Sequence, residues 1–237
     1  MSHHLVEARE LSHTYPDGTN SLSGINFIIR HGESVAIVGA NGAGKSTLLL
    51  HLNGTLRATG GEVRIGDLPL NATTLLEVRR AVGMVFQDPD DQLFMPTVLE
   101  DVAFGPRNLG LSAQESETRA LEALRRVGAE HLASKAPYHL SMGEKRRCAI
   151  AAVLSMGPDI LVIDEPSTGL DPRGRRLLIG LLKEFTHTKL IATHDLDLVR
   201  QLCTRTLVLQ QGKLRADGPT ADIFADHGLM EDCGLEG

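Results

Sequence analysis

The stretch Ser34-Val-Ala-Ile-Val38-Gly39-Ala-Asn-Gly-Ala-Gly44-Lys45-Ser46-Thr47 decides the fold of this chain. An apolar segment of strand length runs into a loop that fits the pattern G-x-x-x-x-G-K-[ST], and a helical pattern follows over Lys45–Leu52. In such a loop the backbone N–H groups surround a phosphate, and the positive end of the helix dipole adds to the attraction. The order of strand, loop and helix therefore predicts a nucleotide phosphate site.

Further segments of the same two kinds alternate along the rest of the chain. Strand-length apolar runs occur at Val82–Phe86, Ile160–Ile163, Lys189–Thr193 and Thr206–Leu209, and helical patterns at Gln114–Val127, Gly143–Leu154 and Arg173–Phe185. This alternation predicts an α/β domain with a parallel sheet. The first thirty residues differ: Leu5–Tyr15 and Ser21–Ile29 are predicted to be antiparallel strands around the turn Pro16–Thr19.

Composition excludes several classes of protein. The 237 residues carry 24 Lys and Arg against 30 Asp and Glu, and a net charge of −6 argues against a nucleic-acid-binding protein. The longest apolar run, Cys148–Leu154, is far shorter than the roughly 20 residues of a membrane-spanning helix. The three cysteines suit neither a disulfide framework nor a metal knuckle, which favours a cytoplasmic protein. The ten histidines show no metal-ligand spacing, and the pair His3-His4 is interpreted as part of a disordered terminus and not as a metal site.

The chemistry of a phosphate site assigns roles to five side chains. Lys45 would neutralise charge on the β- and γ-phosphates, Ser46 would coordinate magnesium, and Thr47 could add a phosphate contact. A second apolar strand, at residues 160–163, ends in Asp164 and Glu165. At the carboxyl edge of a parallel sheet these acids are expected beside the phosphate loop, with Asp164 bound to magnesium and Glu165 as the base for an attacking water.

Other motifs, in matching order and spacing, resemble those of the ATP-binding subunit of ABC transporters over nearly the whole chain. Gln87 resembles the Q-loop glutamine of that family, and Leu140–Glu144 resembles its signature loop. Ser167–Asp171 resembles the D-loop, and His194 the switch histidine. Tyr15 is placed like the aromatic residue that stacks on adenine.

The resemblance implies a fold, cofactors and a set of site residues. It implies a single ABC ATPase domain over residues 1–237: a P-loop core with a parallel sheet, an antiparallel β subdomain at about 1–33, an α-helical signature subdomain at about 88–157 and a short tail at about 215–237. The implied cofactors are ATP and Mg²⁺. The implied catalytic residues are Glu165, His194 and Gln87; the nucleotide-binding residues are Gly39, Ala40, Asn41, Gly42, Ala43, Gly44, Lys45, Ser46, Thr47, Tyr15, Ser141 and Gly143; the magnesium ligands are Ser46, Gln87 and Asp164.

The signature loop departs from the family pattern at two positions. Met142 replaces a glycine, and Glu144 replaces a glutamine. Ser141 and Glu144 also fit the S-x-x-E pattern of a helix capping box, and a capped helix N-terminus is a ready phosphate site. The acidic Glu144 would weaken phosphate binding unless it folds back as a cap, and the sequence leaves this open.

The segment after Gln87, Asp88–Gly110, resembles the ATPase of energy-coupling-factor importers and, within them, the cobalt and nickel branch. Half of all the phenylalanines, Phe86, Phe94 and Phe104, lie in or beside it. In ABC subunits this segment lines a groove that receives a helix of the membrane protein, and a helix in a groove needs apolar anchors. The resemblance therefore implies integral membrane partners that dock around Phe94 to Phe104, although core packing is the alternative for any single phenylalanine.

The predicted function is an ATPase, peripheral at the cytoplasmic face of the membrane, that powers import of a transition-metal ion, most favourably cobalt. Two copies would sandwich two ATP molecules. The alternative is the same ATPase role in import of nickel or a vitamin. A DNA-repair ABC ATPase would need a long coiled coil in the roughly 95 residues between Lys45 and Ser141, which contain no heptads. A translation factor of the ABC type would need two phosphate loops in one chain, and this chain has one. A nucleoside kinase would share the phosphate loop but not the signature loop, the D-loop and the switch histidine.

Overall fold

In a computed structural model, which describes residues 6–235, the chain divides into two compact units. The first unit comprises residues up to Val82, Asp159–Asp164 and the chain from Thr186 onward, and the second comprises Gly83–Pro158 and Glu165–Phe185. The predicted strand start at Leu5 and the pair His3-His4 lie outside the described residues. A single domain over 1–237 stays a prediction.

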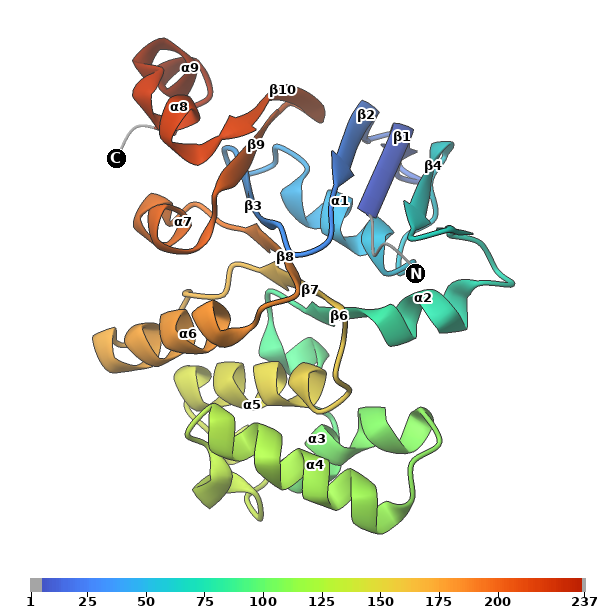
Figure 1. Cartoon of the computed structure of the whole chain (residues 1–237), viewed down its shortest axis with the longest axis vertical. Coiled ribbons are helices and arrows are strands. Elements are labelled where there is room, and N and C mark those ends of the chain that lie inside the picture. The colour runs from blue at the N-terminus through green and yellow to red at the C-terminus, as the bar shows by residue number, and fades with distance from the viewer. Residues whose placement is uncertain (1–5, 236–237) are drawn as a thin grey trace. The chain divides into compact units, whose positions relative to one another are not determined.

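The first unit contains an antiparallel sheet built from the N-terminal part of the chain. Its strand order is β2-β1-β4-β5, with β1 at Val6–Thr14, β2 at Asn20–Ile29, β4 at Gly60–Ile65 and β5 at Leu68–Pro69 (Figure 1). The β1–β2 pairing confirms the predicted antiparallel strands, and the predicted turn closes through a Tyr15 N–H bond to the Thr19 carbonyl at 2.9 Å.

The same unit contains the parallel sheet that the α/β alternation predicts. Five strands run in the order β10-β9-β3-β8-β7: β3 is Ser34–Val38, β7 Ile160–Asp164, β8 Thr188–Ala192, β9 Arg205–Gln210 and β10 Lys213–Pro219. The pairs β3–β8, β3–β9 and β7–β8 are parallel, and β10 is antiparallel to β9. Every residue of β7 and β8 is buried, as continuous apolar runs in a covered parallel sheet require. The unit also holds α1 (Lys45–Leu52), α2 (Leu75–Ala81), α7 (Leu196–Leu202), α8 (Thr220–Ala225) and α9 (His227–Asp232).

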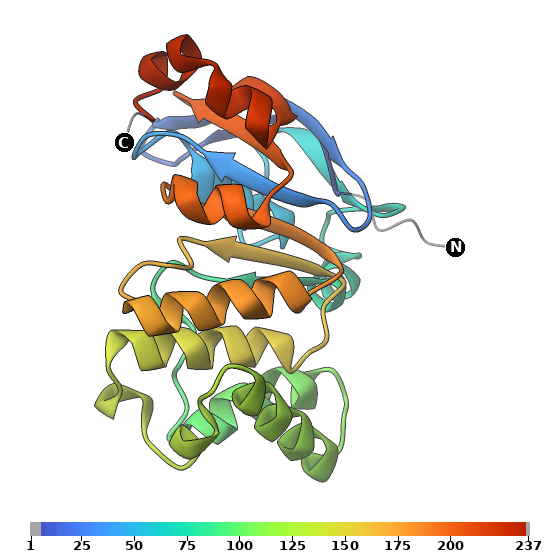
Figure 2. The ribbon, with the colours of Figure 1, turned by 60° about the vertical axis from the view of Figure 1, so that its left-hand side comes forward.

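The second unit is mainly helical. It comprises α3 (Val98–Asn108), α4 (Ala113–Arg126), α5 (Met142–Leu154) and α6 (Pro172–Glu184), and β6 (Val82–Val85) runs into it from the last residue before the boundary. Helices α3, α4 and α5 pack on one another, and α6 runs alongside α5 in both ribbon views (Figure 2). No helix within residues 6–235 combines the length and apolar character needed to cross a membrane.

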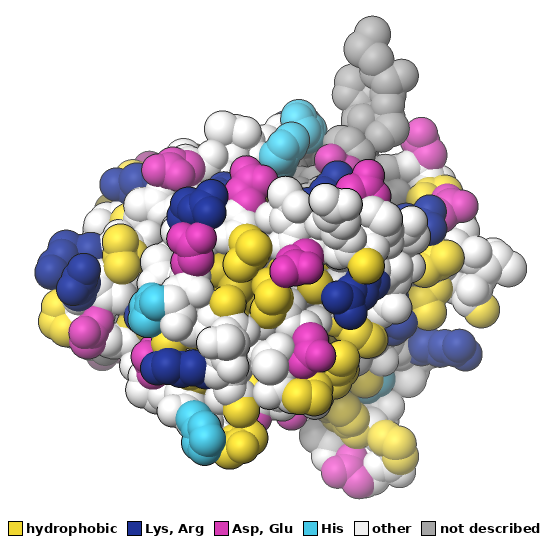
Figure 3. All heavy atoms as spheres, turned by 90° about the horizontal axis from the view of Figure 1, so that it is seen from below, with side chains coloured by type: hydrophobic (Ala, Val, Ile, Leu, Met, Phe, Trp, Pro, Cys, Tyr) yellow, Lys and Arg dark blue, Asp and Glu magenta, His cyan; other side chains and the backbone are white. Residues whose placement is uncertain are grey.

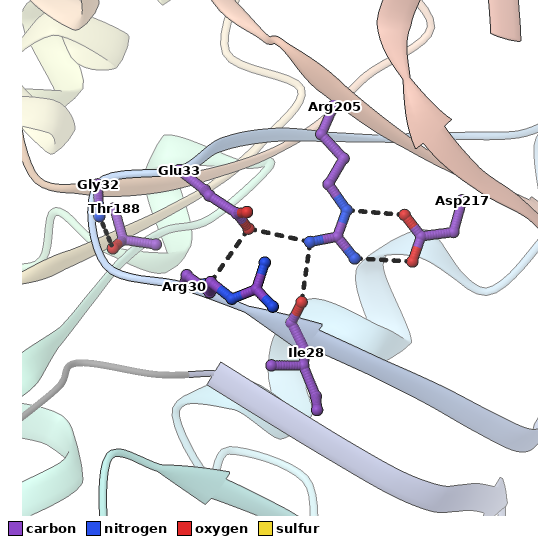
Figure 4. A network of polar contacts seen from close by, with 7 residues as sticks. All are labelled: Ile28, Arg30, Gly32, Glu33, Thr188, Arg205 and Asp217. Atoms are coloured by element: carbon purple, nitrogen blue, oxygen red, sulfur yellow. Dashed lines mark hydrogen bonds and ion pairs between the residues drawn. The ribbon is translucent and has the colours of Figure 1, made fainter. Parts of the chain in front are cut away.

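A charged network joins the two sheets of the first unit (Figure 4). Arg205 of β9 donates to both carboxylate oxygens of Asp217 on β10, each at 2.7 Å. The same guanidinium reaches Glu33 and the Ile28 carbonyl of β2, both at 2.9 Å. The hydrogen bonds to Asp217 are the main reason that the pKa of Arg205 is raised. One side chain therefore ties β2 of the antiparallel sheet to two strands of the other sheet.

Several elements were not predicted from the sequence. Helix α3 has a signal that could have identified it, because Thr97 and Glu100 form a capping box at its start. Pro106 lies within this helix and weakens its pattern. Strand β10 alternates exposed and half-buried residues at a sheet edge, so it has no apolar run to detect.

Candidate functional site

The phosphate loop connects β3 to α1 in the conformation that its glycines allow. Gly44 has a φ of 103°, and a methyl group at this position would lie 2.7 Å from the Ser21 carbonyl oxygen. Lys45 is buried, and its ammonium donates to the Gly39 and Ala40 carbonyls at 2.8 and 3.1 Å. These contacts hold a positive charge inside the loop, where it can meet an anion.

Three parallel strands bring further site residues of the first unit to the edge where this loop begins. The sheet register places Ile37, Ala192 and Asp164 in one row across β3, β8 and β7. The phosphate loop leaves this edge after β3, and His194 follows β8. His194 lines a cavity of about 590 Å³ together with Gly39, Ala40 and Asn41 of the loop. The carboxyl edge of the sheet thus gathers the predicted phosphate loop, carboxylate and histidine.

The two adjacent carboxylates have different backbone settings. Asp164 is the last residue of β7 and is 3% exposed. Glu165, which begins a segment of the second unit, is 6% exposed and has a φ of 46°, in the left-handed region that few side chains adopt. A strand residue followed at once by a left-handed one does not continue the alternation of the strand, which agrees with separate roles for the two groups.

Ser46 and Asp164 offer oxygen donors of the kind that Mg²⁺ prefers. Magnesium binds through one or two protein oxygens plus substrate phosphates and water, not through an all-protein cage. The described part of the chain holds no group of three or more His, Cys, Asp or Glu side chains that could bind a metal ion. A hydroxyl on α1 and a carboxylate at the end of β7 fit a magnesium ion shared with a nucleotide.

Tyr15 directly follows β1 and contacts the phosphate-binding helix. Its hydroxyl lies 3.0 Å from Thr47 Oγ1, which also accepts a hydrogen bond from Ser21 Oγ at 2.9 Å. The predicted base-stacking residue and a predicted phosphate-binding residue are therefore in direct contact. The sequence analysis did not identify two histidines beside this contact, because neither belongs to a motif. The His13 ring meets the Tyr15 ring and the His51 ring edge to face.

In the second unit, the signature loop begins helix α5 as a capping box. Glu144 Oε2 accepts from Ser141 N and Oγ at 2.9 and 2.8 Å, so Glu144 folds back as a cap. These hydrogen bonds lower the pKa of Glu144. Gly143 faces the D-loop, because a methyl group added at Gly143 would lie 3.6 Å from the Gly169 carbonyl oxygen. Met142 packs over Gly169. The signature loop and the D-loop are thus neighbours.

Gln87, also in the second unit, is exposed, and a buried arginine fixes its backbone. Arg146 of α5 is 1% exposed and donates to the carbonyls of Phe86 at 2.9 Å and Gln87 at 2.5 Å. Sequence reasoning missed Arg146, because a basic residue in the helical run Glu144–Arg147 gives no sign of burial.

The segment that follows Gln87 exposes two of the phenylalanines singled out above. Phe94 is 62% and Phe104 40% exposed, and their rings meet edge to face with centroids 5.0 Å apart. Asp101 is buried below them and accepts from the N–H groups of Phe94 and Met95, both at 2.9 Å. Phe86 is half-buried. The turn that presents Phe94 is therefore held from beneath by a carboxylate.

The predicted site residues consequently fall into two groups. The first unit brings together Tyr15, residues 39–47, Asp164 and His194, and the second unit holds Gln87, Ser141, Gly143 and Glu165.

Comparison with known proteins agrees with these motifs. The sequence profile of the ABC transporter family matches residues 22–168. A Geobacter sulfurreducens protein whose name assigns it to ABC transporter ATP-binding proteins is 67% identical, covering 100% of this chain and 95% of the relative. The energy-coupling factor transporter ATP-binding protein EcfA of Methanothermobacter thermautotrophicus is 49% identical, covering 98% of this chain and 76% of EcfA.

Solved structures of ABC ATPases are also similar to this chain. The cbiO1 protein of Clostridium perfringens, described as part of the ABC transporter complex cbiONQ, has a TM-score of 0.82 at 40% identity, covering 99% of this chain and 96% of that one. A dimeric ATP-binding cassette bound to ADP and phosphate has a TM-score of 0.83 at 31% identity, covering 91% of this chain and 98% of that one. The chain therefore belongs to the ABC transporter family, as an ATP-binding subunit of the energy-coupling-factor type with an ATPase activity coupled to transport.

Proposed function

We propose that this ATPase acts as a pair of identical copies that sandwich two ATP molecules and drive import of a transition-metal ion, cobalt in the first place. The nucleotide role is supported above all by the register that aligns Ile37, Ala192 and Asp164 across three parallel strands. With this register, the phosphate loop, a carboxylate and His194 lie at one edge of the sheet. The dimeric state of a related cassette supports the pairing.

In the proposed mechanism, each residue acts on a distinct part of ATP. The N–H groups of residues 39–44 and the Lys45 ammonium hold the β- and γ-phosphates. Ser46, Asp164 and Gln87 would hold magnesium, which neutralises phosphate charge during transfer. Glu165 accepts the proton of the attacking water, and His194 contacts the γ-phosphate region.

The signature loop completes the site of the other copy. Ser141 and Gly143, at the capped start of α5, present a helix N-terminus to the γ-phosphate held by the second chain. Closure of the pair therefore depends on ATP, and hydrolysis reopens it, because the open and closed states differ in affinity for ATP and ADP.

Integral membrane subunits are proposed to dock on the surface formed by Phe94 and Phe104. The exposure of both rings supports this surface, because monomeric proteins rarely leave adjacent aromatic side chains uncovered without a binding role. Figure 3 shows one face of the molecule, on which hydrophobic side chains gather between charged ones. The ATPase is accordingly peripheral, at the cytoplasmic face of the membrane.

The cobalt assignment rests on the resemblance of Asp88–Gly110 to the cobalt and nickel branch, and nickel or a vitamin is the alternative. The test is uptake of labelled Co²⁺ and Ni²⁺ by cells that lack their own importers and express the whole complex. ATP-dependent Co²⁺ uptake that Lys45→Ala abolishes is the expected result. Uptake of Ni²⁺ alone, or of neither ion, contradicts the cobalt assignment, and uptake that survives Lys45→Ala contradicts the ATPase role.

A further inference from the structure

Two buried histidines lie between the predicted adenine platform and the phosphate-binding helix. The His13 ring of β1 meets the Tyr15 ring edge to face, with centroids 4.6 Å apart, and it meets the His51 ring of α1 at 4.7 Å. His51 Nδ1 lies 2.7 Å from the Thr47 carbonyl, and the Thr47 hydroxyl lies 3.0 Å from the Tyr15 hydroxyl. The four residues form a closed circuit from the end of β1 to α1 and back, in which the Thr47 backbone carbonyl makes the contact to His51.

The hydrogen bonds of these residues indicate which ring nitrogens carry protons. The Thr47 carbonyl can only accept, so His51 Nδ1 carries the proton and His51 Nε2 is an acceptor. That nitrogen lies 3.1 Å from His13 Nδ1, which must then be the donor, and the Arg57 carbonyl at 3.2 Å shares the same proton. His51 is therefore neutral and protonated on Nδ1, and His13 carries a proton on Nδ1.

Burial favours the neutral state of His51. His13 is 6% and His51 1% exposed, and burial lowers the pKa of His51. His13 Nε2 is buried and makes no hydrogen bond within the described residues. An apolar side chain would fill this space without the cost of desolvating two imidazoles. What the imidazoles add is direction, because their hydrogen bonds to the backbone fix the planes of both rings.

We propose that His13 and His51 are positioning residues for recognition of the nucleotide base: the pair holds the Tyr15 ring at a fixed distance from helix α1, so that base and phosphates are bound in one register. This inference rests on the proposed function, in which Tyr15 stacks on adenine and residues 39–47 bind phosphate. The phosphate loop has supports of its own, since Lys45 bonds to the loop carbonyls and Gly212 N donates to the Ala43 carbonyl at 3.1 Å.

The test compares a ligand with a base and a ligand without one. Affinities of magnesium ATP and magnesium tripolyphosphate are measured by calorimetry for the purified full chain and for His13→Leu and His51→Leu. We expect each variant to weaken ATP binding about tenfold, as loss of a stacking contact would. Tripolyphosphate binding should change by no more than about twofold, because its contacts lie on the loop. This retained binding also shows that the variants are folded.

Two further variants sharpen the result. His13→Leu combined with Tyr15→Leu should bind ATP no more weakly than Tyr15→Leu alone, since the histidine acts through the tyrosine. Ser21→Ala is the matched control: it removes a hydrogen bond to the same Thr47 hydroxyl without touching either imidazole, so it should not separate the two ligands.

The outcomes are distinct. Equal weakening of both ligands by the histidine variants, or weakening of neither, overturns the proposal. Wild-type protein that binds tripolyphosphate as tightly as ATP contradicts base stacking by Tyr15, and wild-type protein that binds neither ligand contradicts the proposed function; either result also removes the inference. If the leucine variants do not fold, ¹⁵N spectra of the unmodified protein at neutral pH decide: His51 should show the Nδ1–H tautomer, and the other tautomer or a charged His51 ring overturns the proposal.

Discussion

At the scale of single residues, Asp164 and Glu165 differ in backbone conformation although they are adjacent. Asp164 ends a regular buried strand, whereas the φ of 46° at Glu165 is one that a side chain adopts only when its surroundings impose it. Backbone strain of this kind is frequent at functional sites. We therefore expect the two carboxylates to be separable by mutation.

Glu165→Gln should leave ATP binding intact and abolish most hydrolysis. The amide has the same shape but cannot accept the proton of the attacking water, and loss of a general base costs about 10²–10⁴ in rate, or roughly 3–5 kcal/mol of barrier. The closed pair of chains should then persist. Size-exclusion chromatography should show a shift from monomer towards dimer with ATP but not with ADP.

Asp164→Asn is the matched control for this prediction. It should impair binding of magnesium ATP, because it removes a negatively charged oxygen from the proposed metal site. Hydrolysis by Glu165→Gln at the unmodified rate would mean that another group is the base, with His194 the next candidate. Loss of ATP binding in Glu165→Gln would mean that Glu165 binds the nucleotide.

At the scale of elements, helix α3, which carries Phe104, and the turn before it, which carries Phe94, form the proposed docking surface. Phe94→Asp should weaken copurification with the membrane subunits and leave ATP binding unchanged, because it places a charge in an apolar contact. Tyr138→Asp is the control, since Tyr138 is an aromatic residue of the same unit that is 75% exposed. Unchanged copurification with Phe94→Asp would show that this phenylalanine does not take part in docking.

The Arg205 network is expected to stabilise the first unit, because it joins the two sheets of that unit. Arg205→Lys keeps the charge but loses the paired hydrogen bonds to Asp217 and the reach to Glu33. We expect a loss of about 1 kcal/mol in the free energy of unfolding, below the roughly 1.5–3 kcal/mol of a charged hydrogen bond, because lysine keeps the charge and the Arg205 side chain is 23% exposed. Urea unfolding measures it.

The control for the Arg205 network is Arg125→Lys, which changes a similar pair with Glu130. That pair is more exposed and joins residues only five apart, so its loss should leave the urea midpoint unchanged. Equal shifts for the two variants would show that the Arg205 network does not stabilise the junction of the two sheets.

At the scale of the whole molecule, the phosphate loop and the signature loop belong to different units, and the proposed site combines loops from two chains. Mixing Lys45→Ala chains with Ser141→Arg chains gives dimers with one site that carries both changes and one that carries neither. ATP-dependent closure, measured by crosslinking, should partly recover only in the mixture. Each variant alone is the control, and failure of the mixture to recover would argue that one chain completes its own site.

Much of this site could be predicted from the sequence, because its motifs are local. The phosphate loop needs only a strand, glycines at set positions and a helix, all within Ser34–Leu52. The Ser141–Glu144 cap is likewise a matter of four consecutive residues. Parallel strands with buried faces appear as apolar runs, so the edge that gathers residues 39, 164 and 194 could be anticipated as well.

Other features were decided only by the tertiary structure. His13 and His51 are 38 residues apart, and nothing in either local sequence indicates that their rings meet. Burial of Arg146 and exposure of Phe94 depend equally on which elements pack around them. The physical reason is range: caps, turns and glycine loops are set by neighbours within a few residues, whereas side-chain contacts between distant segments exist only once the strands and helices have packed together.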